Sequence, residues 1–394
     1  MKTSDYRTKT LFLKKNNIKP SETVWPVGLD VGYSSVKVVS GNAAVCFPSY
    51  AMINNADIEI RVGITDSRSI LYKGEDGITW LVGAVAQDMI DEGDAAANTL
   101  SVFARNRYSS PMFKILARVG IAAGSRTNEY GDPAGKKLLL QTGLPPKYMA
   151  GDSDELYRAL SGHHKYSVKF GDSEWEDFEY DLSGQAGMGD GDSNIYIMDQ
   201  PMGTVLSIMM DRNTRLTKDA MDYARSRLLV VDPGFGTLDI FPVIRNTVQR
   251  KSCDTNENLG MRRVLSDTSD EIMRRFHTDI PVQTMQQYLE TGSVVKHDGF
   301  KTSKEPFIDI LEKNSRAVCT EMMNYIAPWL DRTEYLVITG GTGEAWFKYI
   351  MEDEHIRDAG ALTVVPGNAG DPDFPFLFSN ARGFYMRAAA KAKS

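Results

Sequence analysis

Residues 30–37 read DVGYSSVK and residues 232–239 read DPGFGTLD, and the two octapeptides align without a gap at a spacing of 202 residues. Asp matches Asp, Gly matches Gly, an aromatic side chain matches an aromatic one, and a hydroxyl matches a hydroxyl. Only the last position differs in charge, with Lys37 aligned to Asp239. Because each octapeptide lies between apolar segments typical of strands, the repeat predicts one tight hairpin turn in each half of the chain.

These hairpins have the composition of phosphate-binding turns. Their glycines present backbone N–H groups with no side chain in the way, and neither GxGxxG nor GxxxxGK[ST] occurs there. Two such turns predict a clamp on a polyphosphate, in which Lys37 neutralises charge and Asp30 and Asp232 hold a hydrated Mg2+. One such turn alone is equally an ordinary hairpin. A third glycine cluster, TGGTG at 339–343, follows a buried strand and favours the nucleotide interpretation.

The composition is that of a soluble globular protein with two or more domains. The chain has 394 residues, of which 42% are apolar and 25% are charged. It contains no run of about 18 apolar residues and no apolar leader, so we expect neither a membrane span nor a signal peptide. Three dispersed cysteines without CxxC indicate a cytoplasmic protein without a metal cluster. The net charge of −7 argues against direct binding of nucleic acid.

Short valine-rich segments predict strands. Those between residues 27 and 50 form a meander, and further strands are expected at 138–145, 228–243 and 335–341. The strands alternate with predicted helices, so the pattern is typical of an α/β protein.

Two stretches carry clear helix signals. Ser110 or Ser109 could cap one helix with Pro111 in its first turn, and this helix follows another helical stretch from residue 95. A helix over residues 259–276 would place one set of side chains on its buried face: Met261, Val264, Leu265, Thr268, Ile272 and Phe276.

Two segments are strongly charged. Residues 1–24 hold six basic and two acidic side chains, which predicts a solvated basic tail, with an arm that binds a partner or another copy as the alternative. Residues 171–194 hold eight acidic side chains and no Lys or Arg, which predicts a solvated acidic hairpin. A calcium loop starting at Asp190 is rejected, because Ile195 and Pro201 occupy the positions that require glycine and glutamate.

The order of the motifs, with DQPMGT at 199–204 between the hairpins, resembles the actin, Hsp70 and sugar kinase superfamily. Within it, FPSY at 47–50, TGLPPKY at 142–148 and SNARGF at 379–384 resemble the bacterial actins of plasmid partition, the ParM and Alp types. The resemblance covers residues 25–388.

The resemblance implies an α/β, actin-like two-domain fold. Each half would be a mixed five-stranded sheet with flanking helices, similar to ribonuclease H, with the nucleotide in the cleft between the halves. Domain I would comprise residues 25–215 and 375–394, domain II residues 216–374, and residues 1–24 would precede them as the tail.

The resemblance also assigns nucleotide-binding residues. They are Asp30, Gly32, Tyr33, Ser34, Ser35 and Lys37 in the first phosphate motif, Asp232, Gly234, Phe235, Gly236 and Thr237 in the second, and Gly340, Gly341, Thr342, Gly343 and Glu344 in the adenosine loop.

The resemblance also implies catalytic and base-contacting positions. Gln200 falls where actin-like proteins place a Glu or Gln that orients the attacking water. The sequence departs from the Pro-Glu pattern of ParM, so Asp199 is an alternative, and a polar strand end is a purely structural one. Arg262 and Arg263 are similar in place to base-contacting residues, with a solvated helix face as the alternative.

The expected function is that of a filament-forming ATPase that uses Mg2+ and ATP, with GTP as the alternative nucleotide. It would assemble with copies of itself and segregate a plasmid or similar DNA element through a DNA-binding adaptor, without contact to a membrane. Two alternatives remain open: a small-molecule kinase of the same fold, and a cytoskeletal scaffold with no role in DNA segregation.

Overall fold

The computed structural model describes residues 2–14, 21–54, 67–89, 107–183, 193–282, 284–298 and 301–392. The chain divides into two compact units. Unit 1 comprises Met1–Thr8 and Lys218–Leu377, and unit 2 comprises Lys9–Thr217 and Phe378–Ser394. The chain therefore passes from one unit to the other at three places. No helix among the described residues is long and apolar enough to cross a membrane.

A six-stranded mixed sheet is the centre of unit 2. Its strands lie in the order β1-β4-β3-β2-β8-β11, and β2, β8 and β11 are parallel. The predicted meander is confirmed, because β2, β3 and β4 pair antiparallel in succession. The strands are β1 (Leu11–Lys14), β2 (Val24–Val31), β3 (Ser35–Ser40), β4 (Ala43–Pro48), β8 (Lys137–Leu144) and β11 (Ile195–Asp199).

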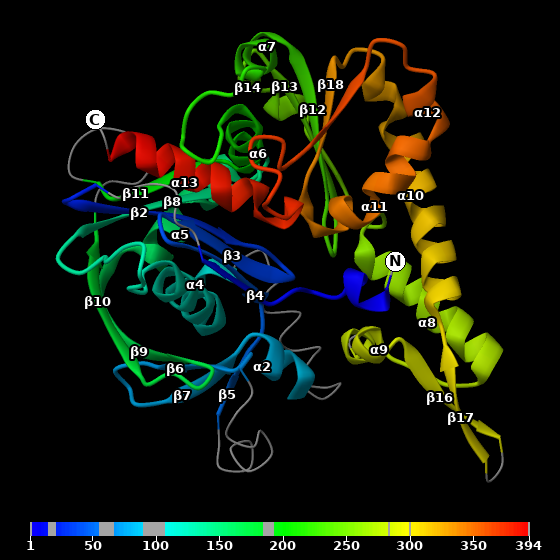
Figure 1. The fold of residues 1–394 in the computed structure, drawn as a ribbon, viewed down its shortest axis with the longest axis horizontal. Coiled ribbons are helices and arrows are strands. Elements are labelled where there is room, and N and C mark those ends of the chain that lie inside the picture. Colours follow the sequence, from blue (N-terminus) through cyan, green and yellow to red (C-terminus); the bar gives the residue numbers. More distant parts are fainter. Residues whose placement is uncertain are drawn as a thin grey trace. The chain divides into compact units, whose positions relative to one another are not determined.

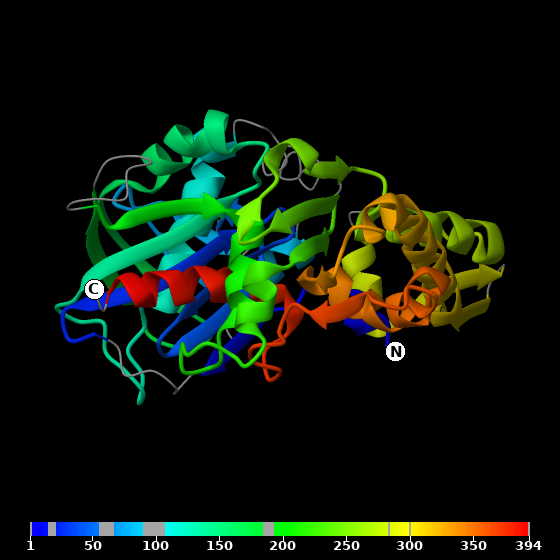
Figure 2. The ribbon, with the colours of Figure 1, turned by 90° about the horizontal axis from the view of Figure 1, so that it is seen from above.

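Two helices cover opposite faces of this sheet, α4 (Pro111–Gly124) and α13 (Ser379–Lys391) (Figures 1 and 2). A Cβ atom on Gly120 of α4 would meet the side chain of Leu29 in β2. A Cβ atom on Gly28, the residue before Leu29, would meet the backbone of α13. Neighbouring strand residues point to opposite faces, so these glycines let a helix approach each side closely. The predicted start of α4 is confirmed, since Ser110 Oγ accepts from the Phe113 N–H at 3.1 Å.

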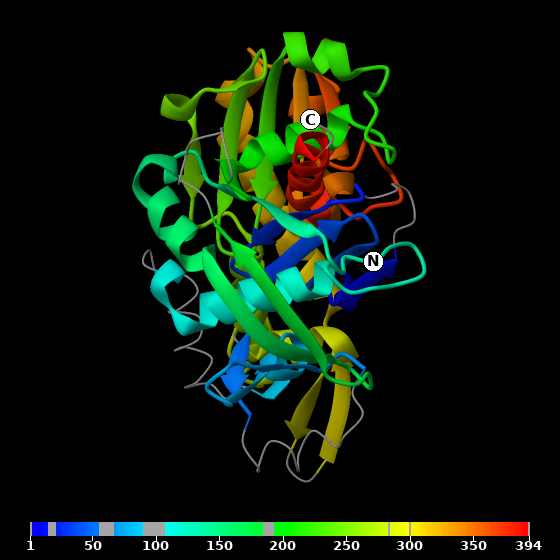
Figure 3. The ribbon, with the colours of Figure 1, turned by 90° about the vertical axis from the view of Figure 1, so that its left-hand side faces the viewer.

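A second, five-stranded sheet in unit 2 has the order β10-β9-β6-β7-β5 and includes the long β9–β10 hairpin (Figure 3). Exposed acidic side chains of β10 pair across it, as Glu179 does with Lys165. The described part of the acidic stretch supplies the turn and the second strand of this hairpin, whose first strand, β9, precedes the stretch. Asp190 and Asp192 lie outside the described residues, as do residues 95–106 of the expected helical stretch. The elements are β5 (Ala51–Ile53), β6 (Ile70–Lys73), β7 (Thr79–Val82), β9 (Gly162–Phe170), β10 (Glu176–Leu182), α2 (Ala84–Met89), η2 (Arg107–Ser109) and α5 (Met149–Leu160).

Unit 1 repeats the plan of unit 2. Its sheet has the order β14-β13-β12-β18-β19, with β15 paired to β13, and β12, β18 and β19 are parallel. In unit 2 the corresponding five strands are β4-β3-β2-β8-β11. When the five strands of each unit are numbered by their order in the chain, both sheets have the order 3-2-1-4-5. The strands are β12 (Arg227–Pro233), β13 (Leu238–Ile244), β14 (Thr247–Val248), β15 (Asp254–Asn256), β18 (Tyr335–Ile338) and β19 (Thr363–Pro366).

The helices of unit 1 pack on this sheet and on one another (Figure 1). The predicted helix over 259–276 is α8, and all six residues expected on its buried face are buried. A separate hairpin, β16–β17, follows α9. These elements are α7 (Ala220–Arg225), η3 (Arg250–Ser252), α8 (Met261–Phe276), α9 (Met285–Thr291), β16 (Ser293–Asp298), β17 (Lys301–Pro306), α10 (Ile308–Leu330), α11 (Gly340–Glu352) and α12 (Glu354–Arg357), with η4 (Phe376–Phe378) just before α13.

Two differences from the sequence-based expectation stand out. The mixed sheet with flanking helices is present in each unit, but each five-stranded sheet has a sixth strand, β1 or β15. The prediction of a solvated basic tail is wrong for the described residues before β2. Thr3 and Tyr6 of η1 (Thr3–Tyr6) are buried, and β1 pairs with β4. Counting charges overlooked the burial of Tyr6 and the pairing of β1 with β4, which together stabilise ordered structure.

Candidate functional site

The first glycine hairpin lies between β2 and β3 in unit 2. Its turn is closed by a hydrogen bond from the Gly32 N–H to the Ser35 carbonyl at 3.0 Å. Ser49 at the end of β4 supports the turn, because its N–H donates to the Ser34 carbonyl and its hydroxyl donates to the Gly32 carbonyl. Sequence reasoning did not assign Ser49, although the segment FPSY had been singled out as a family signature.

Lys37 and Asp30 face each other across this hairpin. They are register partners in the β2–β3 pair, and Nζ of Lys37 lies 3.7 Å from Oδ2 of Asp30. A Cβ atom on Gly32 would lie 2.9 Å from the same Nζ, so the ammonium group sits directly over the glycine turn. The predicted neutralising cation is therefore placed beside the backbone predicted to cradle phosphate.

Gln200 lies at the same edge of the sheet as this hairpin. The strands β2, β8 and β11 are parallel, so their carboxyl ends, with Asp30 near one and Asp199 at another, share an edge. Gln200 is the first residue of α6 (Gln200–Met209), and Asp199 precedes it as the N-cap without a side-chain capping bond. Both side chains are half-buried.

The helix that begins at Gln200 is held closely by α13. Gly203 and Gly383 meet there, and a Cβ atom on Gly383 would overlap the Gly203 backbone. The fully buried Arg382 donates to the Ser207 hydroxyl at 3.1 Å and to the Met210 carbonyl at 2.8 Å, at the other end of α6. These contacts set the position of the helix and with it that of Gln200.

The second glycine hairpin, between β12 and β13 in unit 1, has the same turn. The Gly234 N–H donates to the Thr237 carbonyl at 2.7 Å, and both residues are 202 positions after their counterparts in the first turn. Asp232 and Asp239 are register partners, as Asp30 and Lys37 are. The Asp239 carboxylate accepts hydrogen bonds from the hydroxyl groups of Thr237 and Thr255.

The matched aromatic residues of the repeat have a structural role. Tyr33 packs on the core of unit 2, with the Arg107 guanidinium 4.8 Å from its ring centre. Phe235 packs on the core of unit 1. Both aromatic side chains are half-buried, and these contacts help to anchor the two turns.

The predicted adenosine loop is the first turn of α11 and touches the second hairpin. Gly340 has φ +77°, and a Cβ atom on it would overlap Oδ1 of Asp232. The Thr342 hydroxyl donates to the Gly234 carbonyl at 3.1 Å. Gly343 packs against β18, Glu344 is half-buried and Gly341 is exposed. The second phosphate motif and this loop thus form one cluster in unit 1.

The start of α8 closes the other side of this cluster. The Arg262 N–H donates to the Phe235 carbonyl at 2.7 Å, while both predicted arginine side chains are exposed. Nε of Arg263 lies 2.7 Å from an Asp267 carboxylate oxygen. Gly260 precedes α8, and a Cβ atom on it would lie 2.8 Å from the Phe235 carbonyl, a constraint that sequence reasoning missed.

Asp30 and Asp232 fit the requirements of Mg2+. Oδ1 of Asp232 lies where a Cβ atom on Gly340 would overlap it, Asp30 lies beside Lys37, and carboxylate oxygens are the hard ligands that Mg2+ prefers. No cluster of three or more His, Cys, Asp or Glu ligands occurs among the described residues. An ion held at either carboxylate would therefore take its further ligands from water or phosphate oxygens.

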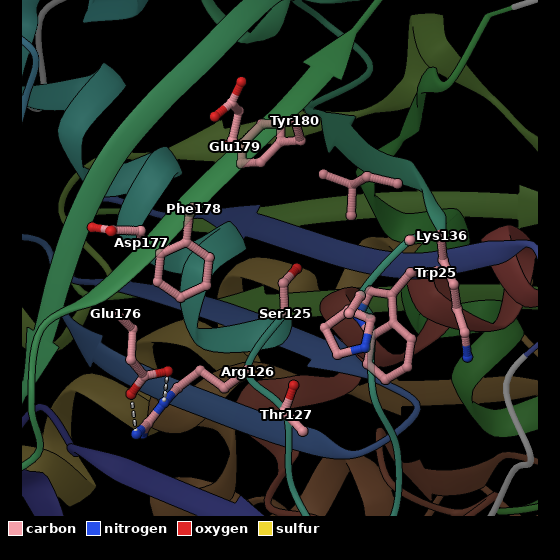
Figure 4. A pocket seen from close by; sticks show the side chains of 14 residues that line it. Trp25, Ser125, Arg126, Thr127, Lys136, Glu176, Asp177, Phe178, Glu179 and Tyr180 are labelled. Carbon is pink, nitrogen blue, oxygen red and sulfur yellow. Dashed lines mark hydrogen bonds and ion pairs between the residues drawn. The ribbon is translucent and has the colours of Figure 1, made fainter.

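A pocket of about 330 Å³ elsewhere in unit 2 is separate from these clusters (Figure 4). It lies between β10 and residues 125–138. Nε of Arg126 donates to Glu176 at 3.0 Å in its wall, and Nζ of Lys136 lies 5.3 Å from the ring centre of Trp25. None of the predicted nucleotide-binding residues lines this pocket.

Comparison with known proteins points to one family and one fold. Residues 28–181 match the family model described as actin like proteins N terminal domain. No curated protein matches the chain significantly.

Three solved structures illustrate the likeness of fold. One is a non-polymerisable quadruple mutant of pCBH ParM, with 18% identity, TM-score 0.64, and coverage of 94% of this chain and 100% of that one. A 15-stranded ParM filament from Clostridium botulinum has 17% identity, TM-score 0.64, and coverage of 94% and 99%. The archaeal actin homologue Ta0583 in complex with ADP has 16% identity, TM-score 0.59, and coverage of 94% and 99%.

Proposed function

Because residues 28–181 match the family model of actin-like proteins and the chain has the actin-like fold, we propose that this protein is a nucleotide-dependent, filament-forming ATPase. One observation carries the nucleotide site. Two glycine turns, 202 residues apart in sequence and closed by the same hydrogen bond, end equivalent strands in the two units. Backbone turns of this kind bind phosphate.

Each cluster contributes a distinct part to the reaction. Gly32 and Gly234 present backbone N–H groups to phosphate oxygens, and Lys37 adds a positive charge beside the first turn. Asp30 and Asp232 provide oxygen ligands for Mg2+, which when bound supplies further neutralisation of phosphate charge.

The remaining residues would complete the site. Gln200, held at its sheet edge by α6, orients the attacking water by hydrogen bonding, and Asp199 is the alternative for that role. Gly340 to Glu344, at the start of α11, receive the nucleoside beside the second turn. Arg262 and Arg263 at the start of α8 are candidates for contact with the base.

The biological role proposed follows from this chemistry and from the relatives. A related ParM forms a 15-stranded filament, and a related archaeal actin homologue binds ADP. We propose that this chain likewise assembles with copies of itself, prefers ATP, and uses hydrolysis to time the release of subunits. Segregation of a plasmid or similar DNA element through a DNA-binding adaptor is the proposed use of such filaments.

The nucleotide site is tested by comparing Asp232→Ala with Asp270→Ala. Both substitutions remove one carboxylate from unit 1, but Asp270 is an exposed residue of α8. We expect Asp232→Ala to lose phosphate release from Mg-ATP and Asp270→Ala to retain it. An Asp232→Ala variant that hydrolyses ATP at the wild-type rate contradicts the site.

Electron microscopy and pelleting with Mg-ATP test the assembly. Filaments that appear with nucleotide support the proposal. A protein that never pellets, but releases ADP only when a sugar or another small acceptor is added, is instead a kinase of the same fold.

A further inference from the structure

The segment before β2 has a position that its basic composition did not predict. Its first part, η1, belongs to unit 1, and its second part, β1, belongs to unit 2. The change from one unit to the other falls between Thr8 and Lys9. The segment is therefore a third covalent connection, in addition to those at residues 217–218 and 377–378.

The first part is anchored on α9 in unit 1, as the segment next to the label N in Figure 1 shows. The buried Thr3 hydroxyl donates to the Leu289 carbonyl at 2.8 Å, and the Thr8 N–H donates to Oε1 of Gln286 at 2.9 Å. Tyr6 is 4% exposed and belongs to the hydrophobic core of unit 1.

The end of α9 leaves room for this segment to pack closely. Gly292 ends the helix with φ +68°, and a Cβ atom added to it would lie 2.9 Å from Oγ1 of Thr3. A glycine is therefore required both by the backbone conformation and by the side chain that packs against it. Arg7 adds an ion pair with Glu290.

The second part is anchored on unit 2. All four residues of β1 pair with β4, from Leu11 opposite Cys46 to Lys14 opposite Ala43. The Cys46 thiol donates to the Lys9 carbonyl at 3.3 Å, and the ring of Phe12 packs edge-on against Phe170. The last anchor on unit 1, at Thr8, and the first on unit 2, at Lys9, are on adjacent residues, so no free chain separates them.

We propose that residues 2–14 are a strap that restrains movement between the two units. A connection anchored at adjacent residues has no slack, so the two anchors cannot move apart unless one of them breaks, and the movement left to the units there is rotation about the backbone of Thr8 and Lys9. The anchor on unit 1 depends on the buried side chains of Thr3 and Tyr6, and the anchor on unit 2 depends on the pairing of β1 with β4.

A consequence for nucleotide exchange rests on the proposed function. If nucleotide binds to both glycine turns as proposed, movement of one turn away from the other would favour its release, and a strap that restrains such movement slows that release. Release of the strap then accelerates exchange without any change in the residues that contact the nucleotide.

The test measures the distance between two spin labels, one on each unit, in the full chain. Glu75→Cys in unit 2 and Thr302→Cys in unit 1 place the labels at exposed positions, and Cys253→Ser removes the more accessible native thiol. Tyr6→Ala removes a buried aromatic side chain and so weakens the anchor on unit 1. A six-residue Gly-Ser insertion between Thr8 and Lys9 leaves both anchors intact and adds slack.

We expect a broader distance distribution for Tyr6→Ala and for the insertion, and an unchanged one for the exposed neighbour Ser4→Ala. An insertion variant with the wild-type distribution overturns the strap, even if Tyr6→Ala fails to fold. Release of a fluorescent ATP analogue, measured on the same variants, tests the consequence separately. Failure of every variant to bind nucleotide contradicts the proposed function, and the label distances still decide the strap.

Discussion

At the scale of single residues, a substitution of Gln200 distinguishes an effect on ATP hydrolysis from an effect on nucleotide binding. A residue that only orients water contributes to the transition state and little to ground-state affinity. We expect Gln200→Ala to slow phosphate release by about 10-fold to 1000-fold, the range of a lost positioning contact, with nearly unchanged nucleotide affinity. Filaments of this variant should assemble with ATP and then persist, as light scattering would show.

The structural alternative for Gln200 makes a different prediction. A polar side chain that merely satisfies the end of β11 would, when truncated, lower the melting temperature and weaken binding together. Normal phosphate release in Gln200→Ala removes the residue from the catalytic role, and Asp199→Asn becomes the variant to measure, because both side chains are half-buried at the same strand end.

The buried side chain of His164 leads us to expect that the free energy of unfolding depends on pH, and this effect does not require nucleotide. Nε of Arg118 donates to its Nδ1 at 3.3 Å, and Nε2 lies 2.9 Å from the Leu160 carbonyl, which assigns a neutral ring with the proton on Nε2. Burial lowers the pKa of His164. As pH falls through about 6.5, the unfolded chain takes up a proton that the folded chain does not, so stability is lost.

Urea unfolding at pH 7.5 and pH 5.5 measures this effect. We expect wild type to lose more stability between the two pH values than His164→Gln does. His163→Gln is the matched control, because the neighbouring His163 is exposed and pairs with Asp181. Equal losses in wild type and His164→Gln would contradict a neutral buried imidazole.

At the scale of elements, the junction of β18 and α11 depends on one glycine. Gly340 has φ +77°, and a side chain there would also overlap Asp232. We expect Gly340→Ala to destabilise unit 1 by at least about 1–2 kcal/mol, the usual cost of a left-handed conformation for a residue with a Cβ atom. Chemical denaturation of the nucleotide-free protein measures this loss.

Gly341→Ala is the matched control for this prediction. The next residue in the same helix turn has no positive φ, and the nearest atom to an added Cβ is 3.8 Å away. Alanine there reduces the entropy of the unfolded chain, so stability is expected to stay the same or rise by roughly 0.5–1 kcal/mol. Equal losses at both positions would show that the junction is sensitive to any substitution.

At the scale of the whole molecule, net charge predicts how assembly depends on salt. Subunits with a net charge of −7 repel one another, and about 0.1 M salt screens charges separated by more than about 10 Å. We expect the fraction pelleted with Mg-ATP to rise between 10 mM and 100 mM salt. Less pelleting at 100 mM would indicate that attraction between opposite charges dominates the contact between subunits.

Much of the architecture was predictable from short motifs. The spacing of the two octapeptides predicted two hairpin turns, and the same Gly-to-Ser or Gly-to-Thr hydrogen bond closes both. The buried face of α8 and the start of α4 at Ser110 followed from periodicity and capping. Such signals are local, since a turn, a cap or a helix face is specified by residues within a few positions of one another.

Other features depend on residues far apart in sequence, and local patterns did not reveal them. Ser49 supports the turn at Gly32, Gly260 makes room beside Phe235, and η1 seats on α9 some 280 residues later. Each of these contacts exists only after sheets and helices have packed. Neither sequence periodicity nor composition predicts these contacts.

The amino-acid sequence by itself determined that this chain has two glycine hairpins on a repeated plan, because turn geometry and strand patterning are written in consecutive residues. Only the tertiary structure decided which groups meet. It placed Gly340 against Asp232 and Lys37 over Gly32, and it gave ordered structure to a segment whose charge suggested solvation. The reason is physical: the burial of Tyr6 and the pairing of β1 gain free energy only from partners supplied by distant parts of the fold.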